Sequence, residues 1–570
     1  MLHKTSSRLI AYTLVFLTIS ACQFDRNQQV FTPDSIADSA MVVTAHRAAT
    51  EVGIQILKQG GNAYDAAIAV QFALAVVYPQ AGNIGGGGFA VVRLADGTTE
   101  TLDFREKAPL AASQNMYLDS LGNVIEGKST KGHKAVGVPG VVDGMVKLHQ
   151  KYGTLPWSEL VKPAIGLAQK GFALKEEQAN RINRYQDEFN EQNSYRIPLI
   201  NEKGWQKGDS IKLPQLANTL QLIADSARGG FYDGSTARKI IAEMQRGKGL
   251  ITLEDLELYE SKWREPLIGN YKEHKIITMA PPSSGGVALL QLLQGSRFYD
   301  LGNYSPDDAK RVHLMTELMR RVYADRATYL GDPDYIDVPI QMLLDSVYNV
   351  ERFSTIDSNR KTPSAEIKEG NVEVIESTET THFTIVDKDR NAVAITTTVN
   401  GLFGCKVMVE GAGFFLNNEM DDFSAKPGVA NQFGLVGSQA NAIAPQKRML
   451  SSMTPTIIEK EGELYMTIGT RGGATIITAV YETIINVIDN EMSLKEAVEV
   501  PKFHHQWQPD EVYLEGTHYN EQTKNGLEEL GHKVDFKEVL GKMRGVLVHP
   551  DGSLEGACDP RRSQGVAIGY

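Results

Sequence analysis

Thr380 stands where a polar stretch of chain changes into a predicted β-strand. Residues 355–379 are rich in serine, lysine and glutamate and lack a hydrophobic period, which is typical of an exposed loop or linker. A cut between Glu379 and Thr380 would give Thr380 a free α-amine beside its hydroxyl. A threonine hydroxyl needs a base, and an α-amine with a pKa of about 7.7–8.0 can be that base at neutral pH. Thr380 could therefore be both nucleophile and base, although most threonines that begin a strand are only β-formers.

The segments after Thr380 alternate in the manner of β-hairpins. A first hairpin is predicted from His382 to Val386 and from Ala392 to Thr398, around a turn rich in Asp and Asn. A second spans Pro455 to Ile468, and a last one turns at Asp551-Gly552. Between these two, Gly472-Gly473 begins an apolar helix that runs through Ile488.

The segments before Thr380 are mainly helical. A helical pattern starts at Ala45 and stops at Gly60-Gly61, and Asn62 is placed to cap a second helix that is apolar on all sides through Val77. A stiff turn over 281–286 precedes another apolar helix, and an amphipathic helix around 314–322 ends at Gly331. Hairpins flanked by buried helices indicate a layered α/β domain.

Three further patterns were weighed for cofactor or metal chemistry. The glycine run at 85–88 lacks the residues that complete a nucleotide-binding loop, so close backbone packing is the better interpretation. His504 and His505 are adjacent and would point apart on a regular element. Asp421-Asp422 has no third ligand at a useful spacing. We therefore predict no metal site.

Motifs spread along the chain resemble those of the γ-glutamyltranspeptidases, which are N-terminal-nucleophile hydrolases. Thr380-Thr381-His382-Phe383 resembles the start of that family's small subunit. Further matching motifs, in the family's order, are Gly60-Gly61-Asn62-Ala63, Pro79-Gln80-Ala81-Gly82-Asn83, Asp103-Phe104-Arg105-Glu106, Gly137-Val138-Pro139-Gly140, Pro282-Ser283-Ser284-Gly285-Gly286, Tyr323-Ala324-Asp325-Arg326, Asn417-Asn418-Glu419-Met420-Asp421-Asp422-Phe423 and Leu450-Ser451-Ser452-Met453. The resemblance covers the chain from about residue 40 to its C-terminus.

This resemblance implies an αββα sandwich made jointly by two chains after self-cleavage between Glu379 and Thr380. The large subunit would span 41–379 and the small catalytic subunit 380–570. The implied activity is transfer of a γ-glutamyl group from glutathione or a related donor to Thr380, and then to water, an amino acid or a dipeptide. No cofactor is implied.

The resemblance also assigns roles within the site. Thr398 would hydrogen-bond the Thr380 hydroxyl, and the N–H groups of Gly472 and Gly473 would form the oxyanion hole, as donors at a helix N-terminus can. Arg105, Ser451 and Ser452 would bind the substrate α-carboxylate, whereas Asn400, Glu419 and Asp422 would hold its α-ammonium.

Two positions depart from the family pattern. Phe433 takes the gating position of the loop over 428–446 that covers the glutamyl pocket, where some relatives have tyrosine, so the ring is kept and its hydroxyl is lost. Arg471, just before the oxyanion glycines, could alter the preference for an acceptor.

The N-terminus has the features of an export signal. Lys4 and Arg8 precede a short apolar stretch, and Ile19-Ser20-Ala21-Cys22 resembles a lipoprotein cleavage site. We therefore expect a signal peptide over 1–21 and a tether over 22–40 with lipid on Cys22. An ordinary cleaved signal is the alternative. The expected location is periplasm-facing, where Cys405 and Cys558 could pair.

The remaining composition narrows the choice of function. The 58 Lys and Arg against 70 Asp and Glu give a net charge of −12, which argues against nucleic acid as a partner. Two alternatives remain: a β-lactam or glutaryl acylase of the same fold, and a non-catalytic peptide-binding lipoprotein. Arg105 and Asp422 argue against the first, because an acylase need not hold an α-amino acid. The full catalytic set argues against the second.

Overall fold

The structure is a computed structural model that describes residues 35–367, 380–426, 429, 437–516, 519–561 and 565–570. Three predicted functional residues, Cys22, Glu379 and Phe433, lie outside these ranges, as does the predicted signal peptide. In the described part of the chain, no helix is both long and apolar enough to cross a membrane.

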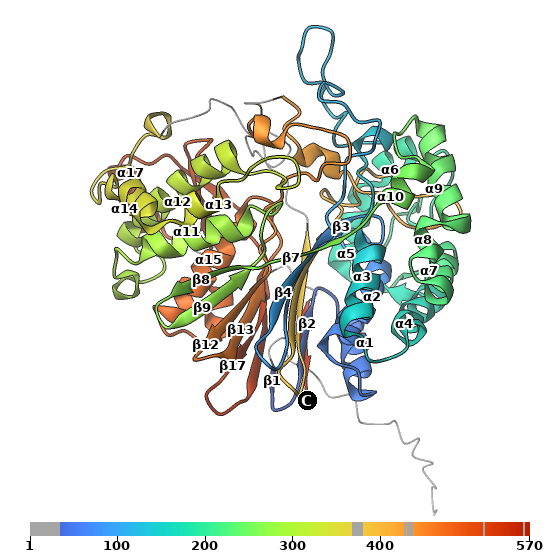
Figure 1. The fold of residues 1–570 in the computed structure, drawn as a ribbon, viewed down its shortest axis with the longest axis horizontal. Helices are drawn as coiled ribbons and strands as arrows, with labels where there is room; N and C mark the ends of the chain where they lie inside the picture. The colour runs from blue at the N-terminus through green and yellow to red at the C-terminus, as the bar shows by residue number, and fades with distance from the viewer. Residues whose placement is uncertain (1–34, 368–379, 427–428, 430–436, 517–518, 562–564) are drawn as a thin grey trace, which may run out of the picture.

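Two seven-stranded sheets form the centre of the molecule (Figure 1). Neighbouring strands are antiparallel in every pair of both sheets. In spatial order, the first sheet is β1 (Ser35–Ala37), β18 (Leu554–Cys558), β17 (Arg544–Val548), β13 (Glu463–Gly469), β12 (Thr456–Lys460), β9 (His274–Thr278) and β8 (Leu267–Tyr271), and the second is β19 (Val566–Gly569), β2 (Met41–Thr44), β10 (Thr381–Val386), β11 (Ala392–Thr398), β3 (Gly87–Arg93), β4 (Thr99–Asp103) and β7 (Lys262–Arg264).

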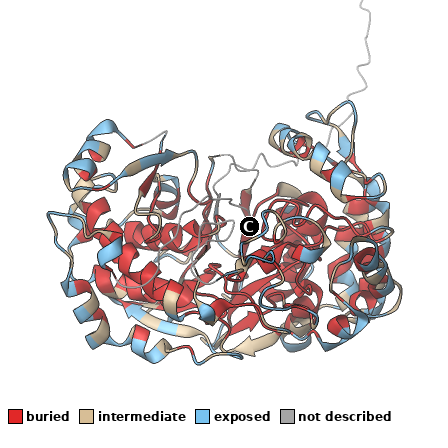
Figure 2. Ribbon diagram, turned by 90° about the horizontal axis from the view of Figure 1, so that it is seen from above, coloured by how far each residue is buried: buried red, intermediate tan, exposed pale blue. Residues whose placement is uncertain are grey.

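Helices cover the outer face of each sheet, which gives four layers. Each helix layer closes a large apolar core against its sheet, and a smaller core lies between the sheets. Figure 2 shows the buried residues concentrated along the centre of both halves and the exposed ones on the outer helices. The second sheet packs on α1 (Arg47–Lys58), α2 (Ala63–Val77) and, behind them, α3 (Val141–Tyr152), α4 (Trp157–Lys170) and α7 (Pro214–Ser226). The first packs on α11 (Gly285–Ser296) and α15 (Thr475–Ile488), and α12 (Ala309–Tyr329) packs against α11.

The strand pair β10–β11 shows why the sequence folds this way. Along it, Phe383 and Ile395 face the helices, whereas Ala392 and Ala394 face the other sheet. This alternation is the period of two that a strand buried on both faces requires. Thr380 precedes the first residue of β10, so the predicted nucleophile lies at the end of a fully buried strand.

Most predicted elements are confirmed. The three hairpins, the helix capped by Asn62 and the helix that follows Gly472-Gly473 are all present, and every residue of α2 is buried. The first helix begins at Arg47 rather than at Ala45, because the His46 side chain caps it. The αββα fold class is confirmed.

The tether predicted over 22–40 is wrong for its last residues. Residues 35–37 form β1 and pair with β18, and the N–H of Ser39 donates to the carbonyl oxygen of Tyr570. These partners lie more than five hundred residues away in the chain, so a local polar pattern could not indicate them. Any tether therefore ends before Ser35.

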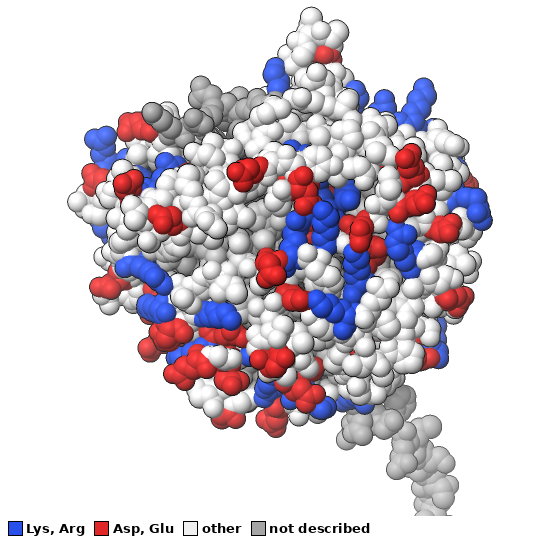
Figure 3. Space-filling view, viewed as in Figure 1, with Lys and Arg blue, Asp and Glu red and all other residues white. Residues whose placement is uncertain are grey.

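The outer surface carries mixed charge. In Figure 3, lysines and arginines are interspersed with aspartates and glutamates on the face shown. Where basic side chains gather, carboxylates accompany them: Arg264 pairs with both Asp103 and Asp334, and Lys262 pairs with Asp334.

Candidate active site

Thr380 and Thr398 lie side by side at the ends of their paired strands. The Thr380 Oγ1 donates to Thr398 Oγ1 over 3.5 Å, and both residues are buried. The Thr398 hydroxyl oxygen also accepts the N–H of Asn400, at 2.7 Å. These contacts hold the Thr398 hydroxyl beside that of Thr380, as predicted from the resemblance.

The glycine run at 85–88 supports this pair from behind. A Cβ on Gly86 would lie 2.0 Å from the carbonyl oxygen of Thr398, and one on Gly85 would lie 2.1 Å from that of Phe415. Asn83 closes the contact, because its amide donates to the Thr398 carbonyl at 2.9 Å and its oxygen accepts the Gly86 N–H. The run therefore allows two stretches of backbone to approach closely, which confirms the prediction of close backbone packing.

Gly472 and Gly473 turn the chain from β13 into α15. Their φ angles are +142° and +56°, a region that favours glycine, and a Cβ on Gly472 would lie 2.3 Å from Thr475 Oγ1. Within the described residues, the N–H groups of the two glycines make no hydrogen bond. Gly473 lines the same pocket as Thr380, and Gly472 precedes it in the chain without being part of the lining. This turn can present N–H donors to a developing oxyanion.

Arg105 is the buried cation of the pocket. Its Nη1 donates to Glu419, and its Nη2 lies 2.5 Å from Asp422 Oδ2. Its Nε and Nη2 also donate to the carbonyl oxygens of Met449 and Leu450, at 3.3 and 3.2 Å. The predicted carboxylate clamp is therefore paired directly with two of the three predicted ammonium ligands.

The acidic groups around Arg105 are strongly perturbed. Burial raises the pKa of Glu419 well above its ordinary value and that of Asp422 above its own, although Arg105 opposes both shifts. Burial also raises the pKa of Glu106 to about 7, again against Arg105. Burial alone would lower the pKa of Arg105, but Glu419 and Asp422 hold it above its ordinary value. Arg105 therefore stays charged and at least one carboxyl takes up a proton readily.

One pocket unites almost all the predicted site residues. Its lining includes Thr380, Thr398, Gly473, Arg105, Asn400, Glu419, Asp422, Ser451 and Ser452. These residues come from six separate stretches of sequence, and the fold alone brings them together. Arg471 is buried and is not part of this lining, so its effect on the acceptor stays a prediction.

Comparison with known proteins agrees with this geometry. A model of the γ-glutamyltranspeptidase family matches residues 49–569. The chain belongs to the γ-glutamyltranspeptidase family. It is 44% identical over 536 residues to the glutathione hydrolase proenzyme of Escherichia coli strain K12, a match that covers 94% of this chain and 92% of that protein.

Solved structures agree as well. The γ-glutamyltranspeptidase of Helicobacter pylori is 44% identical, with a TM-score of 0.55 over 57% of this chain and 94% of that one. A cephalosporin acylase from Bacillus halodurans is 25% identical, with a TM-score of 0.82 over 96% of this chain and 99% of that one. The fold shared with the cephalosporin acylase therefore extends over 96% of the chain.

Arg326 is a pocket residue to which no role was assigned from sequence. It lies on α12, is buried, and donates from Nε to Ser284 Oγ at 2.9 Å and from Nη2 to Ser452 Oγ at 3.1 Å. Burial lowers its pKa to about 10. The only signal was its place in the family motif Tyr323-Ala324-Asp325-Arg326, where an arginine on an amphipathic helix resembles an ordinary surface group.

The hydroxyl oxygens of the two serines each accept a hydrogen bond from the protein. Ser451 Oγ accepts the N–H of Met453 at 3.2 Å, and Ser452 Oγ accepts from Arg326. Each hydroxyl therefore keeps its own proton for donation to an anion. Asn441 is a second pocket residue that was missed from the sequence. Its side-chain amide donates to the carbonyl oxygen of Asp422, and its amide oxygen accepts the N–H of Leu450, so it links the segment that carries Asp422 to the segment that carries the two serines.

Two other side-chain pairs considered from sequence lie away from the pocket. His504 bonds Thr478 and Gln506, whereas His505 bonds the carbonyl oxygen of Glu511, so the rings serve separate neighbours. Cys405 and Cys558 are both buried, in different apolar cores. They do not form the disulfide that was considered.

Proposed function

We propose that this protein is a self-processing γ-glutamyltransferase and glutathione hydrolase whose nucleophile is Thr380. The observation that carries the proposal is the single pocket in which a threonine hydroxyl, a glycine turn and an arginine flanked by carboxylates converge. The proposal includes a cut between Glu379 and Thr380, which yields a large and a small chain.

In the first step the Thr380 Oγ attacks the γ-carbonyl carbon of the donor, and the Oγ proton passes to the Thr380 α-amine. The negative oxygen that forms accepts hydrogen bonds from the Gly472 and Gly473 N–H groups. Collapse breaks the C–N bond, and the leaving amine takes the proton from the α-amine. Removing one such oxyanion donor typically costs about 2.7–4 kcal/mol of transition-state stabilisation.

The donor is recognised by its zwitterionic head. Its α-carboxylate pairs with Arg105 and accepts from Ser451 and Ser452, and its α-ammonium lies against Glu419, Asp422 and the Asn400 amide oxygen. The head thus inserts into an ion pair that already exists. Since it brings one charge of each sign, no buried charge loses its partner when the donor binds.

In the second step, water or the amine of an amino acid or dipeptide attacks the γ-glutamyl ester on Thr380. The α-amine now removes a proton from the attacking group, and the ester C–O bond breaks, which returns the hydroxyl to Thr380. The same base therefore serves both steps.

The decisive test is a Thr380→Ala variant of the full chain. Wild type should run as two chains on a denaturing gel, with Thr380 at the N-terminus of the smaller, and should hydrolyse a γ-glutamyl anilide. The variant should stay as one chain without activity. A cut at another residue, or two chains from the variant, would refute the scheme.

An acylase of the same fold is the second candidate, because the cephalosporin acylase shares the architecture over nearly the whole chain. It has no need for the paired charges at Arg105, Glu419 and Asp422. Rates with a γ-glutamyl and a glutaryl anilide, which differ only in the α-ammonium group, separate the two. The γ-glutamyl substrate should be preferred by at least about tenfold, which corresponds to roughly 1.4 kcal/mol.

We further propose that the enzyme is exported and anchored by lipid on Cys22, facing the periplasm. The support is the charged start, the short apolar stretch and the small residues before Cys22. Labelling with a radioactive fatty acid should mark wild type and fail with Cys22→Ala. Equal labelling of both would contradict the anchor.

A further inference from the structure

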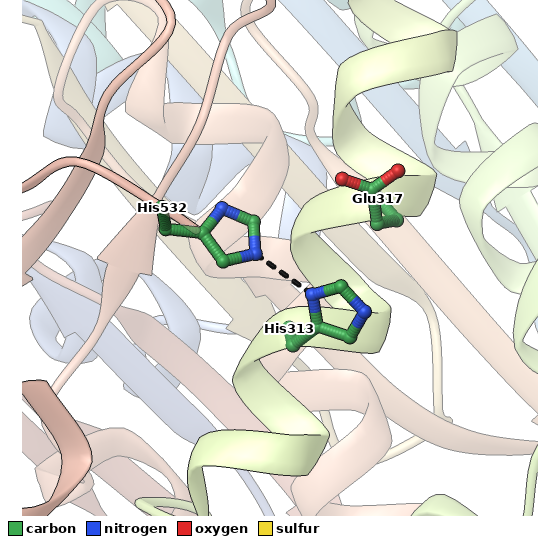
Figure 4. A group of neighbouring side chains, drawn as sticks. All are labelled: His313, Glu317 and His532. Carbon is green, nitrogen blue, oxygen red and sulfur yellow. Dashed lines mark hydrogen bonds between the residues drawn. The ribbon is translucent and has the colours of Figure 1, made fainter. Parts of the chain in front are cut away.

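A second buried cluster lies away from the active-site pocket, between α12 and the C-terminal part of the chain. His313, Glu317 and His532 approach one another there closely enough to suggest a metal site (Figure 4). His313 and Glu317 lie one turn apart on α12, and His532 follows α17 (Glu521–Glu529). All three are buried.

The ring nitrogens of His313 and His532, which a metal ion would need as ligands, already take part in hydrogen bonds. The rings of His313 and His532 face each other, with 2.7 Å between Nδ1 of the first and Nε2 of the second. His313 Nε2 donates to the carbonyl oxygen of Asp357 at 2.9 Å, so its Nδ1 accepts from His532. Arg320 Nη2 then lies 3.5 Å from the remaining nitrogen, Nδ1 of His532. The chain of bonds runs in one direction and leaves both rings neutral.

The carboxylate of Glu317 is equally occupied. Its Oε1 accepts from Arg320 Nε and from the N–H of Thr362, both at 3.1 Å, and its Oε2 accepts from Arg321 at 2.8 Å. Two buried arginines beside the rings would also repel a cation. The cluster therefore has a use other than metal binding.

The residues that the two arginines of the cluster contact indicate its role. Arg321 donates to the side chain and the carbonyl of Thr355, at 3.0 and 3.1 Å, and to the Thr362 hydroxyl at 3.0 Å. Arg320 donates to the Ser364 hydroxyl. Residues 355–367 contain one short 3₁₀ helix, Ser364–Glu366, and otherwise only turns and irregular chain, so these side chains fix a segment that regular secondary structure does not.

The C-terminal part of the chain also contacts the segment 355–367. Asp510 accepts from Arg320, from Lys361 Nζ at 3.1 Å and from the Ser364 N–H at 3.1 Å. Trp507 Nε1 donates to the Ser364 carbonyl at 3.1 Å, and the Lys361 N–H donates to the carbonyl of Leu530. Burial would raise the pKa of Asp510, but Arg320 and the Ser364 N–H hold it well below its ordinary range.

We propose that Asp510, with Arg320 and Ser364, forms an anchor that positions the chain for self-cleavage. The inference rests on the proposed function, because residues 355–367 are the last described part of the chain before the proposed cut. Twelve residues, 368–379, then lead to Thr380. Fixing the chain at Ser364 and at β10 restricts the conformations open to the Glu379–Thr380 peptide, and small misplacements of reacting groups cost rates steeply.

Asp510 would thus be a positioning residue for the cut and not for turnover. It does not line the active-site pocket. After the cut, Asp510 belongs to the small chain and Ser364 to the large one, so the anchor would also hold the new C-terminal part of the large chain in place.

The test compares cleavage with turnover in an Asp510→Asn variant of the full chain. Cell-free synthesis with labelled methionine, followed by a chase, gives the rate constant for appearance of the two chains. We expect this rate to fall at least about tenfold, whereas kcat per cleaved enzyme, titrated through its acyl-enzyme burst, stays within about twofold of wild type. An Asp510→Glu variant, which keeps the charge, should recover part of the rate.

The matched control is Glu410→Gln, which removes another carboxylate of the C-terminal part that pairs with an arginine of the N-terminal part, Arg246, far from Ser364. It should cleave at the wild-type rate. Melting temperatures of the variants in a Thr380→Ala background report any general loss of stability.

Three outcomes would overturn the anchor: cleavage of Asp510→Asn at the wild-type rate, an equal fall in cleavage rate and kcat, or an equal effect in Glu410→Gln. Failure of wild type itself to cut before Thr380 would instead refute the proposed function. The two failures are therefore distinguishable.

Discussion

Two buried arginine–carboxylate clusters in this molecule differ in how completely they are satisfied. Around Glu317, both carboxylate oxygens accept from arginines, and the neighbouring histidines form a closed chain of hydrogen bonds. Around Arg105, Oε2 of Glu419 and both oxygens of Glu106 are buried and receive no hydrogen bond from the described residues. Both clusters are buried, but two arginines surround the one carboxylate of Glu317, whereas three carboxylates surround the one arginine at Arg105.

The difference separates a cluster whose polar groups bond one another from one whose carboxylates keep unused acceptor sites. Burying a carboxylate without donors is costly, and a fold tolerates this cost where another molecule supplies the donors. The excess of acceptors around Arg105 calls for a cation, which fits an α-ammonium group. In the closed cluster the carboxylate oxygens of Glu317 and the histidine nitrogens are already hydrogen-bonded, which is why we assign it a structural role beside the Asp510 anchor.

The largest effect on stability should come from removing the carboxylate of Glu317 from the closed cluster. Glu317→Gln leaves Arg321 buried without a carboxylate, and breaking a buried pair typically costs about 3–5 kcal/mol of unfolding free energy. Urea denaturation in a Thr380→Ala background measures this. Glu410→Gln, at an exposed pair, should cost no more than about 1 kcal/mol. If the two variants were equally stable, the closed cluster would not be holding the fold.

A change at the open cluster should affect catalysis more than stability. Arg105→Lys keeps the charge but loses the planar fork that faces Glu419 and Asp422. We expect kcat/KM for a γ-glutamyl anilide to fall about 10²- to 10³-fold, or about 2.7–4 kcal/mol. The unfolding midpoint of the same variant should shift less than that of Glu317→Gln. A loss of activity below tenfold would argue against Arg105 as the carboxylate clamp.

The smallest effect concerns pH. The pKa of Glu106 is about 7 in the folded protein against an ordinary value of 4.5. The folded state therefore binds a proton that the unfolded state has lost, and stability falls as the pH rises from about 4.5 to 7. Glu106→Gln should remove this fall, on the order of 1–3 kcal/mol.

Unfolding of both proteins at pH 5 and pH 8, again in the Thr380→Ala background, checks the sign. The stability of Glu106→Gln relative to wild type should rise between these two values. A constant difference would mean that Glu106 is ionised at both pH values. The carboxylates of the open cluster would then have more hydrogen-bond donors than the structure shows.

Local patterns in the sequence were sufficient for the elements. The period of two in β10 and β11, the Asn62 cap and the Gly472-Gly473 turn each depend on neighbours within a few residues. The pairing of the edge strand β1 could not be predicted from the sequence. This strand is only three residues long, and it can be recognised only from its pairing with β18. The pattern of residues 355–379 indicated an exposed loop, but the anchor on Ser364 needs Asp510, from the far end of the chain.

The members of the site were predictable only through the family motifs. No local signal joins Arg105 to Glu419, which lie 314 residues apart, and the sequence did not predict that these groups pair directly. Arg326 was missed because a helical period indicates which face of the helix is buried, but it does not indicate which residues the side chain contacts. The prediction for Phe433 stays untested, since it lies outside the described residues.

The strand order has a consequence for the lifetime of the enzyme. In the second sheet, β2 from before the proposed cut lies between β19 and β10 from after it, and in the first, β1 adds to the edge formed by β18. The cut chains are thus woven together and cannot part without melting both sheets. Once melted, however, they are two molecules, so re-forming the sheets becomes a bimolecular and concentration-dependent event. Self-cleavage would turn a chain that can refold alone into a product that is assembled once, and whose persistence is set by how slowly it unfolds.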